Sequence, residues 1–181
     1  MEKIPLPPVG MILLAQVPSG NPFAQKVVVI IRSQPSGIMG LCINQPLRLM
    51  VSDFEEPSNN QILDTIPVYC GGPCQPEKLT ITGLEYQSPH HMQWHFDLNP
   101  NALSQCAEQH PHMKFKAFCG YVGWDFSQFA SEMEQKQWLP IPFPLPSIFL
   151  GTNTRLWETL MLQFYPFAMK APYLPKNPHW N

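Results

Sequence analysis

Charge is scarce in this sequence, and positive charge is nowhere concentrated. Charged residues make up 13% of the chain, about half of the usual share of roughly 25% in globular proteins. The 11 lysines and arginines are spread thinly and form no basic run. Since neutralisation of phosphates by Lys and Arg supplies much of the affinity of nucleic-acid-binding proteins, we do not expect the protein to bind nucleic acid.

Long hydrophobic runs are also absent. The longest, Met11–Ala15 and Val27–Ile31, fall far short of the roughly 18 residues that a membrane helix needs. The first nine residues contain Glu2 and three prolines, which does not fit a secretion signal. The five cysteines are odd in number. We therefore expect a soluble, reduced protein of the cytoplasm with no membrane association.

Proline is plentiful. The 22 prolines are more than twice the usual share of about 5%. A chain of 181 residues is expected to form one domain, which at this size needs neither metals nor disulfides to fold. Because a weakly charged, proline-rich surface suits buried self-contacts, a homo-oligomer is a further prediction.

The stretch Phe118–Met133 is the centre of the predicted fold. It indicates a strand that ends in a glycine-punctuated turn and continues as an amphipathic helix. Asp125 is placed to cap this helix, and Gln128 to complete a capping box. The side chains at i, i+3, i+4 and i+7 share one face and are predicted to be buried: Phe126, Phe129, Ala130 and Met133.

The rest of the chain mixes strands and helices without regular βαβ alternation, which favours an α+β fold. Strands are predicted at Met11–Gln16, Val27–Ile31, Ile38–Asn44, Val68–Cys70, Leu79–Thr82, Met92–Phe96 and Phe115–Tyr121. The turn Gln34–Gly37 joins the second and third strands into a hairpin, and Pro46 is expected to end the third. Further helices are predicted near Gln61–Thr65, Asn101–Gln109 and Arg155–Phe164.

The segment Trp138–Pro146 carries proline at every second position. It is either an edge strand that pairs on one side only or an unpaired polyproline connector. Thr152–Thr154 offers a cap for the last helix. We predict one domain over residues 1–165 and an irregular proline-rich tail over residues 166–181.

Four blocks of the sequence stand out by their order and spacing. They are Gly10–Ala15 with Asn21–Phe23 and Val27–Ile31, then Gly37–Pro46, Pro67–Pro73 and Gly120–Trp124, followed by Gln128, Glu132, Trp138, Phe149 and Trp157. Together these blocks resemble the AlgH/YqgE family of uncharacterised bacterial proteins, and the likeness covers roughly residues 9 to 162. The sequence departs from the family pattern at Ser33–Ser36 and at Gln128–Phe129. It also lacks the usual histidine around Leu79–Gly83.

The resemblance implies a single α+β domain whose mixed, bifurcated sheet curls into a pseudo-barrel with helices packed on it. It also implies a family without established biochemistry, to which a regulatory role in transcription is attached by name.

Three predicted elements end in polar or glycine-rich turns, and their convergence would form a concave ligand site. The candidate ligand-binding residues are Asn44, Pro46, Gly71, Gly72, Pro73, Gly120, Trp124 and Gln128. The alternative is structural: the Gly-Gly-Pro block is only a tight turn, Asn44 only an Asx-turn and Trp124 only a core residue.

Cysteines and histidines give no catalytic or metal-binding pattern. Cys70 and Cys74 lack the C-x-x-C spacing, and Cys42 and Cys119 are expected to be small hydrophobic residues within strands. Histidines gather between residues 90 and 112 without the zincin pattern H-E-x-x-H, so solvated loop residues are expected: His90, His91, His95, His110 and His112.

The preferred hypothesis is a non-enzymatic regulatory module that binds a small ligand or a protein partner, without cofactor or metal. Two alternatives stay open. One is a hydrolase that uses Cys70 or Asn44, and the other is a nucleic-acid-binding transcriptional regulator.

Overall fold

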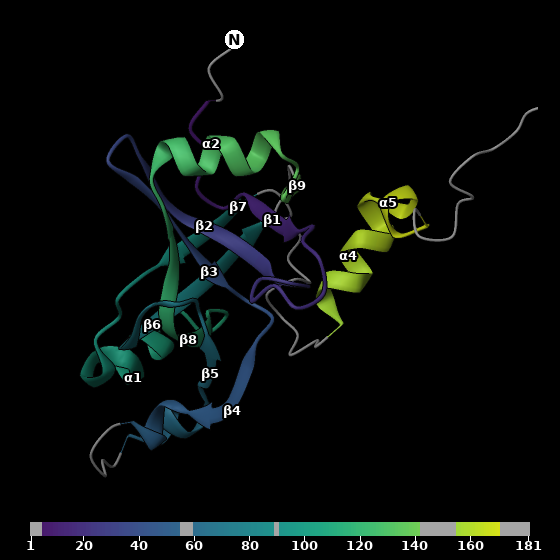
Figure 1. Ribbon diagram of the computed structural model, residues 1–181. Coiled ribbons are helices and arrows are strands. Elements are labelled where there is room, and N and C mark those ends of the chain that lie inside the picture. The colour runs from purple at the N-terminus through teal and green to yellow at the C-terminus, as the bar shows by residue number, and fades with distance from the viewer. Residues whose placement is uncertain (1–4, 55–59, 89–90, 142–154, 171–181) are drawn as a thin grey trace, which may run out of the picture.

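A computed structural model describes residues 5–54, 60–88, 91–141 and 155–170. Its strands are β1 (Ile12–Ala15), β2 (Val27–Gln34), β3 (Gly37–Cys42), β4 (Pro46–Met50), β5 (Pro67–Cys70), β6 (Cys74–Ser88), β7 (His91–His95), β8 (Lys114–Trp124) and β9 (Trp138–Ile141). Its α-helices are α1 (Leu103–Gln109), α2 (Phe126–Glu134), α4 (Leu156–Phe164) and α5 (Pro166–Lys170) (Figure 1). Short 3-10 helices are η1 (Val51–Asp53), η2 (Gln61–Thr65) and η3 (Pro100–Ala102).

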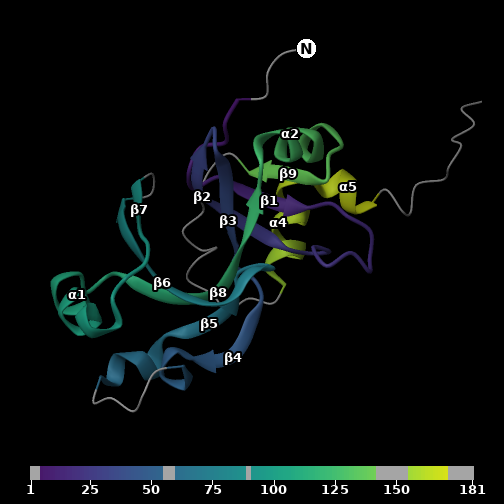
Figure 2. The same ribbon diagram turned by 60° about the vertical axis from the view of Figure 1, so that its left-hand side comes forward.

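The strands form one large mixed sheet that divides at β8. The order along its main path is β4-β5-β8-β3-β2-β1-β9, and β6 also pairs with β8 and carries β7. The first half of β8 lies between β5, which runs parallel to it, and β6, which runs antiparallel, whereas its last residues pair with β3. Figure 2 shows β6, β7 and α1 projecting away from the β1–β2–β9 part. The fold is α+β, as predicted.

The sheet is not closed into a barrel. β4 and β9 stand at the two ends of the main path and do not pair with each other. The bifurcation that the resemblance implies is therefore present at β8, while the described strands do not form the expected pseudo-barrel.

The β2–β3 hairpin forms as the sequence predicts. Gln34 pairs with Gly37, which leaves Pro35 and Ser36 as the turn. Val27–Ile30 are fully buried because the hairpin is covered on both faces. One face contributes Val27, Val29 and Leu41 to the core under α4, and the other contributes Val28, Ile30 and Ile38 to the core under α2.

Helix α2 packs on the sheet as expected from its apolar stripe. Phe129 is buried, and Phe126 and Met133 pack against the same core. The carboxylate of Asp125 caps the helix by accepting from the backbone N–H of Gln128 at 2.7 Å. Hydrogen bonds from the Ser127 hydroxyl and from this N–H lower the pKa of Asp125. The reverse half of the predicted capping box is absent, because the Gln128 side chain donates to Glu132 instead.

The first part of the proline-rich segment is an edge strand. β9 pairs antiparallel with β1, with Pro140 opposite Leu13, and it ends the sheet. The edge-strand interpretation of Trp138–Pro146 is therefore confirmed over Trp138–Ile141. The remainder of this segment, and the predicted cap at Thr152–Thr154, lie outside the described residues.

The C-terminal helix α4 packs against the sheet and is joined to it by hydrogen bonds. α4 buries Leu156, Leu160 and Met161, and the Trp157 indole donates to the carbonyl of Ala15 at 2.8 Å. The Tyr165 hydroxyl donates to the carbonyl of Pro140 at 2.5 Å. None of the helices in the described part of the chain is long and apolar enough to cross a membrane.

Three local predictions need correction. The third strand ends before Pro46 as expected, at Cys42, but Pro46 begins a further strand, β4, that was not predicted. All five residues of β4 are exposed, so no burial alternation marks it in the sequence. β6 is much longer than the predicted Leu79–Thr82, because pairing with both β7 and β8 supports it. The tail is not irregular from its start, since Pro166 occupies the first position of α5, where its missing N–H costs no hydrogen bond.

Candidate functional site

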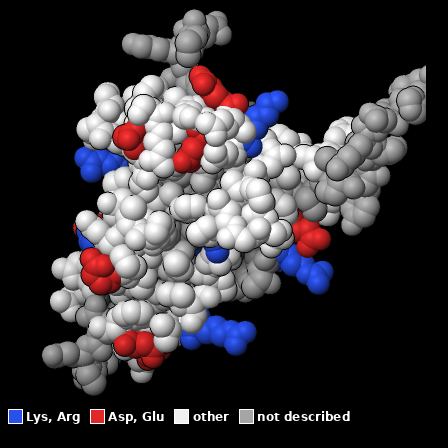
Figure 3. All heavy atoms as spheres, viewed as in Figure 1, with Lys and Arg blue, Asp and Glu red and all other residues white. Residues whose placement is uncertain are grey.

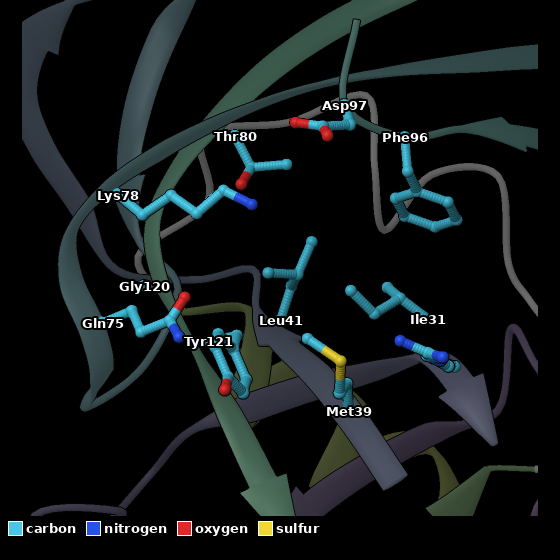
Figure 4. A pocket seen from close by; sticks show the side chains of 11 residues that line it. Ile31, Met39, Leu41, Gln75, Lys78, Thr80, Phe96, Asp97, Gly120 and Tyr121 are labelled. Carbon is cyan, nitrogen blue, oxygen red and sulfur yellow. The ribbon is translucent and has the colours of Figure 1, made fainter. Parts of the chain in front are cut away.

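A cavity of about 510 Å³ opens where the two parts of the sheet diverge from β8 (Figure 4). Its walls come from β2, β3, β6, β8 and the segment after β7. The lining residues are Ile31, Arg32, Met39, Leu41, Gln75, Lys78, Thr80, Phe96, Asp97, Gly120 and Tyr121. Residues from distant parts of the chain therefore meet at one concave surface.

Two irregularities in strand pairing shape this cavity. In β2 the register shifts between Ile30 and Arg32, so Ile31 is an extra residue. In β6 the register shifts between Cys74 and Leu79, and the residues between them include Gln75 and Lys78. Such bulges bend a strand and redirect its side chains, and they are frequent next to functional sites.

Three lining residues also adopt the left-handed backbone conformation. The φ angles are 49° at Gln75, 56° at Asp97 and 69° at Gly120. This conformation costs free energy for residues other than glycine, and it gathers at binding and catalytic sites. Gln75 and Asp97 are therefore held in place by the surrounding structure.

The cavity combines an apolar wall with several polar groups. Leu41 is buried at its base, and Figure 4 shows Ile31, Met39 and Phe96 directed toward the same space. The polar groups are the Lys78 ammonium, the Arg32 guanidinium, the Asp97 carboxylate, the Gln75 amide and the hydroxyls of Thr80 and Tyr121. Lys78 and Asp97 make no side-chain hydrogen bond or ion pair with any described residue.

A shallower hollow of about 370 Å³ adjoins the cavity and shares three of its lining residues, Arg32, Met39 and Tyr121. Cys74, Gly123 and Trp124 line its far side.

The predicted glycines Gly71, Gly72 and Gly120 lie where the backbone after β5 packs closely against the backbone of β8. Gly71 and Gly72 are buried, and the N–H of Gly71 donates to the carbonyl of Cys119 at 2.8 Å. A Cβ atom on Gly71 would overlap the carbonyl oxygen of Gly120, and one on Gly72 would overlap the backbone of Tyr121. Of Gly71, Gly72, Pro73 and Gly120, only Gly120 lines the cavity, and Pro73 is exposed. The Gly-Gly-Pro block thus has a structural explanation.

Trp124 and Gln128 meet at a single carboxylate. Glu132 Oε2 accepts from the indole N–H of Trp124 at 2.8 Å and from that of Trp138 at 2.7 Å. Its Oε1 accepts from the Gln128 side-chain amide at 2.8 Å. The two indole rings pack edge to face, 5.6 Å apart. These residues fasten α2 to β8 and β9.

Asn44 lies apart from both groups. Its Oδ1 accepts from the N–H of Val27 at 2.9 Å, and its Nδ2 donates to the carbonyl of Gln25 at 2.9 Å. Asn44 lines a separate hollow of about 330 Å³ near Trp157, and the neighbouring Pro46 is exposed at the start of β4. Asn44, Gly72 and Trp124 therefore do not share one cavity.

Among the described residues, no cysteine is hydrogen-bonded to a histidine. No described residue hydrogen-bonds to the Cys70 thiol. Glu85 Oε1 lies 3.3 Å from His110 Nδ1, and Glu85 Oε2 lies 3.8 Å from His95 Nε2. Over the described ranges, no group of three or more His, Cys, Asp or Glu residues is arranged to hold a metal. His90 lies outside the described residues.

Comparison with known proteins identifies the family. The AlgH-like family model matches residues 12–165. The chain belongs to the AlgH-like family. A relative, a UPF0301 protein of Pseudomonas putida, is 30% identical over 146 residues, which cover 74% of this chain and 76% of the relative. A UPF0301 protein of Coxiella burnetii is 28% identical over 140 residues, covering 75% and 77%.

Solved structures of similar fold agree with the AlgH-like assignment. The solution structure of the AlgH protein from Pseudomonas aeruginosa has a TM-score of 0.64 at 22% identity, covering 93% of this chain and 94% of that one. A crystal structure of a protein from Corynebacterium diphtheriae has a TM-score of 0.69 at 21% identity, covering 93% of each chain. At these identities the likeness shows the fold.

Local sequence patterns do not indicate most cavity residues of this AlgH-like protein. Arg32 and Lys78 are isolated cations in the sequence, and Asp97 is an isolated acid between Phe96 and Leu98. Gln75-Pro76 within an otherwise extended stretch is the one local hint of an irregular strand. The convergence itself depends on how β2, β6 and β8 pair.

Proposed function

We propose that the cavity between β2–β3 and β6–β8 binds a small amphipathic molecule with an anionic group. On this proposal the protein is a non-enzymatic regulatory module of the cytoplasm. The observation that carries the proposal is the placement of two cations, Arg32 and Lys78, at two separate strand irregularities that border one partly apolar cavity.

The size and lining of the cavity support a small ligand. Small-molecule sites have volumes of about 300–1,000 Å³ and join an apolar wall to a few directed polar groups. The cavity of about 510 Å³ lies within this range. Leu41 and Phe96 can contact the apolar part of a ligand, while Thr80 and Tyr121 can donate hydrogen bonds to a carboxylate or phosphate oxygen.

Asp97 narrows the ligand class further. Its carboxylate lies in the same lining as the two cations and accepts hydrogen bonds only. In Figure 4 it stands near Thr80, on the opposite side of the cavity from Tyr121. A ligand that carries a hydroxyl or ammonium group some distance from its anionic group would satisfy Asp97 as well as the cations.

The lining favours binding over catalysis. Its described residues include no serine, cysteine or histidine, and the groups that could act as nucleophile or base are Lys78, Asp97 and the hydroxyls of Thr80 and Tyr121. Neither Lys78 nor Asp97 makes a side-chain hydrogen bond with another described residue that would pair it as a nucleophile with its base. The hydrolase alternative needs a base beside Cys70, and no described residue hydrogen-bonds to that thiol. The nucleic-acid alternative needs a basic patch, whereas Figure 3 shows Lys and Arg side chains scattered singly over the face in view.

The test is a thermal-shift screen of short-chain carboxylates, hydroxy acids, amino acids and phosphate monoesters against the full chain. We expect at least one class of anion to raise the melting midpoint. The rise should be lost in Lys78→Ala and in Arg32→Ala, because each removes a cation from the lining.

The matched control is Lys114→Ala, which removes an exposed cation of β8 that does not line the cavity. The control should keep the ligand-dependent rise. An equal rise in Lys78→Ala, Arg32→Ala and the wild type would contradict this binding site, and the absence of any response to the panel would contradict the ligand class.

A further inference from the structure

Two cysteines that lie 49 positions apart in the sequence are neighbours across the β5–β8 pair. The register of these parallel strands places Cys70 directly beside Cys119. The hydrogen bond from Gly71 N–H to the Cys119 carbonyl fixes this register next to the pair. No sequence pattern links the two thiols.

The preceding residue pairs show on which face both thiols lie. Tyr69 and Phe118 are paired, and their rings lie 5.7 Å apart within the core under α4. Val68 and Ala117 are also paired, and they belong to the core on the other face. Since side chains alternate along strands, Cys70 and Cys119 share the face of Val68 and Ala117.

Adjacent strands in a sheet are about 4.8 Å apart, and Cα atoms joined by a disulfide are usually about 4.4–6.8 Å apart. The backbone positions of Cys70 and Cys119 therefore suit a disulfide. Burial, and secondly the thiolate of Cys70, raise the pKa of Cys119.

Accessibility separates this pair from Cys42, and location separates it from Cys74. Cys70 is exposed and Cys119 is partly exposed, so small reagents can reach them. Cys42 is buried beside Asn44, and burial raises the pKa of its thiol to about 11. Cys74 lines the hollow near Trp124, to which neither Cys70 nor Cys119 contributes.

We propose that Cys70 and Cys119 form a dithiol site that small-molecule disulfides oxidise reversibly to an intramolecular disulfide. The Cys70 thiolate attacks one sulfur of the small disulfide, which forms a mixed disulfide and releases one thiolate. The deprotonated Cys119 then attacks Cys70 Sγ and releases the second thiolate. Two protein thiols lose two electrons and two protons, and the small disulfide is reduced to two thiols.

The resulting bond would join β5 to β8 beside the crossing of Gly71 and Gly120. It would stand one residue from Gly120, which lines the cavity. The proposal rests on the strand register and on thiol exposure, and it does not depend on what the cavity binds.

The experiment treats the reduced full chain with oxidised glutathione and follows intact mass, free thiols and the peptide map without reduction. The wild type should lose two free thiols, gain no glutathione mass and yield a peptide pair that links Cys70 to Cys119. Dithiothreitol should restore both thiols. Cys106→Ser, which removes a partly exposed cysteine of α1, should behave like the wild type.

Single variants of the pair separate the two steps. Cys119→Ser should stop at a stable glutathione adduct on Cys70, and Cys70→Ser should form no internal disulfide. A lasting glutathione adduct on wild-type Cys70 would overturn the proposal. A link from Cys70 to Cys74, or disulfide-linked dimers as the main product, would also overturn it.

Discussion

Two polar clusters near the C-terminal half of β8 use their hydrogen-bonding groups in opposite ways. In one, Glu132 accepts from both indoles and from Gln128, so both carboxylate oxygens are engaged within the protein. In the other, Lys78 and Asp97 line a cavity and have no side-chain partner among the described residues. The first cluster joins α2 to β8 and β9, while the second leaves its charges available to a ligand.

This difference separates residues that hold the fold from residues that can serve a ligand. Asn44, Trp124 and Gln128 have polar side chains and were predicted to bind a ligand. The structure shows each of them bonded to another part of the chain. A polar residue near a turn is therefore weak evidence of a site until its hydrogen bonds are known.

The largest effect is expected at the glycine crossing. In Gly71→Ala the new Cβ would overlap the Gly120 carbonyl oxygen, and backbone cannot move aside as a side-chain tip can. We expect a loss of about 3 kcal/mol of unfolding free energy or more, measured by urea denaturation. Gly123→Ala is the control, since its Cβ would mainly meet the Tyr121 ring. Equal losses in the two variants would remove the structural role assigned to Gly71.

The next effect is expected at the carboxylate under the two indoles. Glu132→Ala leaves the indole N–H groups of Trp124 and Trp138 without their acceptor, and we expect a loss of about 2 kcal/mol of unfolding free energy. Denaturation followed by tryptophan fluorescence measures it. Glu134→Ala, which removes an exposed carboxylate of the same helix, should change stability little. Similar values for both variants would show that the indole bonds contribute nothing to stability.

A smaller, pH-dependent effect is expected at Lys116. Burial lowers its pKa from 10.5 to about 8, and its ammonium lies 4.6 Å from the Tyr69 ring centroid. Between about pH 8 and pH 10.5 the unfolded chain binds more protons at this residue than the folded chain does. The unfolding free energy therefore rises with pH in this range. Below about pH 8 the folded protein bears the full cost of burying the charged ammonium.

The test compares the wild type with Lys116→Met in urea at about pH 7 and about pH 9.5. Relative to the variant, the wild type should gain about 1–2 kcal/mol of unfolding free energy at the higher pH, since one pKa unit corresponds to about 1.4 kcal/mol. A constant difference would mean that the Lys116 pKa is not lowered by folding.

The smallest effect on stability is expected at the cavity itself. Lys78→Ala removes an exposed ammonium without a described partner, so the unfolding free energy should change by less than about 0.5 kcal/mol. Urea denaturation without added ligand measures it. A loss of unfolding free energy as large as that of Glu132→Ala would mean that Lys78 stabilises the fold. The two clusters would then not differ in the way described above.

Local patterns in the sequence determined most of the elements. The β-branched run Val27–Ile31, the turn before Gly37 and the Asp125 cap each depend on residues close together in the chain, so their outcome follows from local backbone preference and burial. The alternating prolines of Trp138–Pro146 allowed either an edge strand or an unpaired connector, and the pairing of β9 with β1 decided between them. Strand β4 was not predicted, because its exposed residues carry no periodic hydrophobic pattern.

The tertiary structure alone decided the sites. Arg32, Lys78 and Asp97 meet only because β2 and β6 are irregular where they approach β8, and Cys70 meets Cys119 only through the register of two parallel strands. Such meetings depend on pairing between segments tens of residues apart, and no local preference of the chain encodes their register. Most of the strands and helices follow from neighbours in sequence, whereas the cavity and the cysteine pair depend on residues that are neighbours only in space.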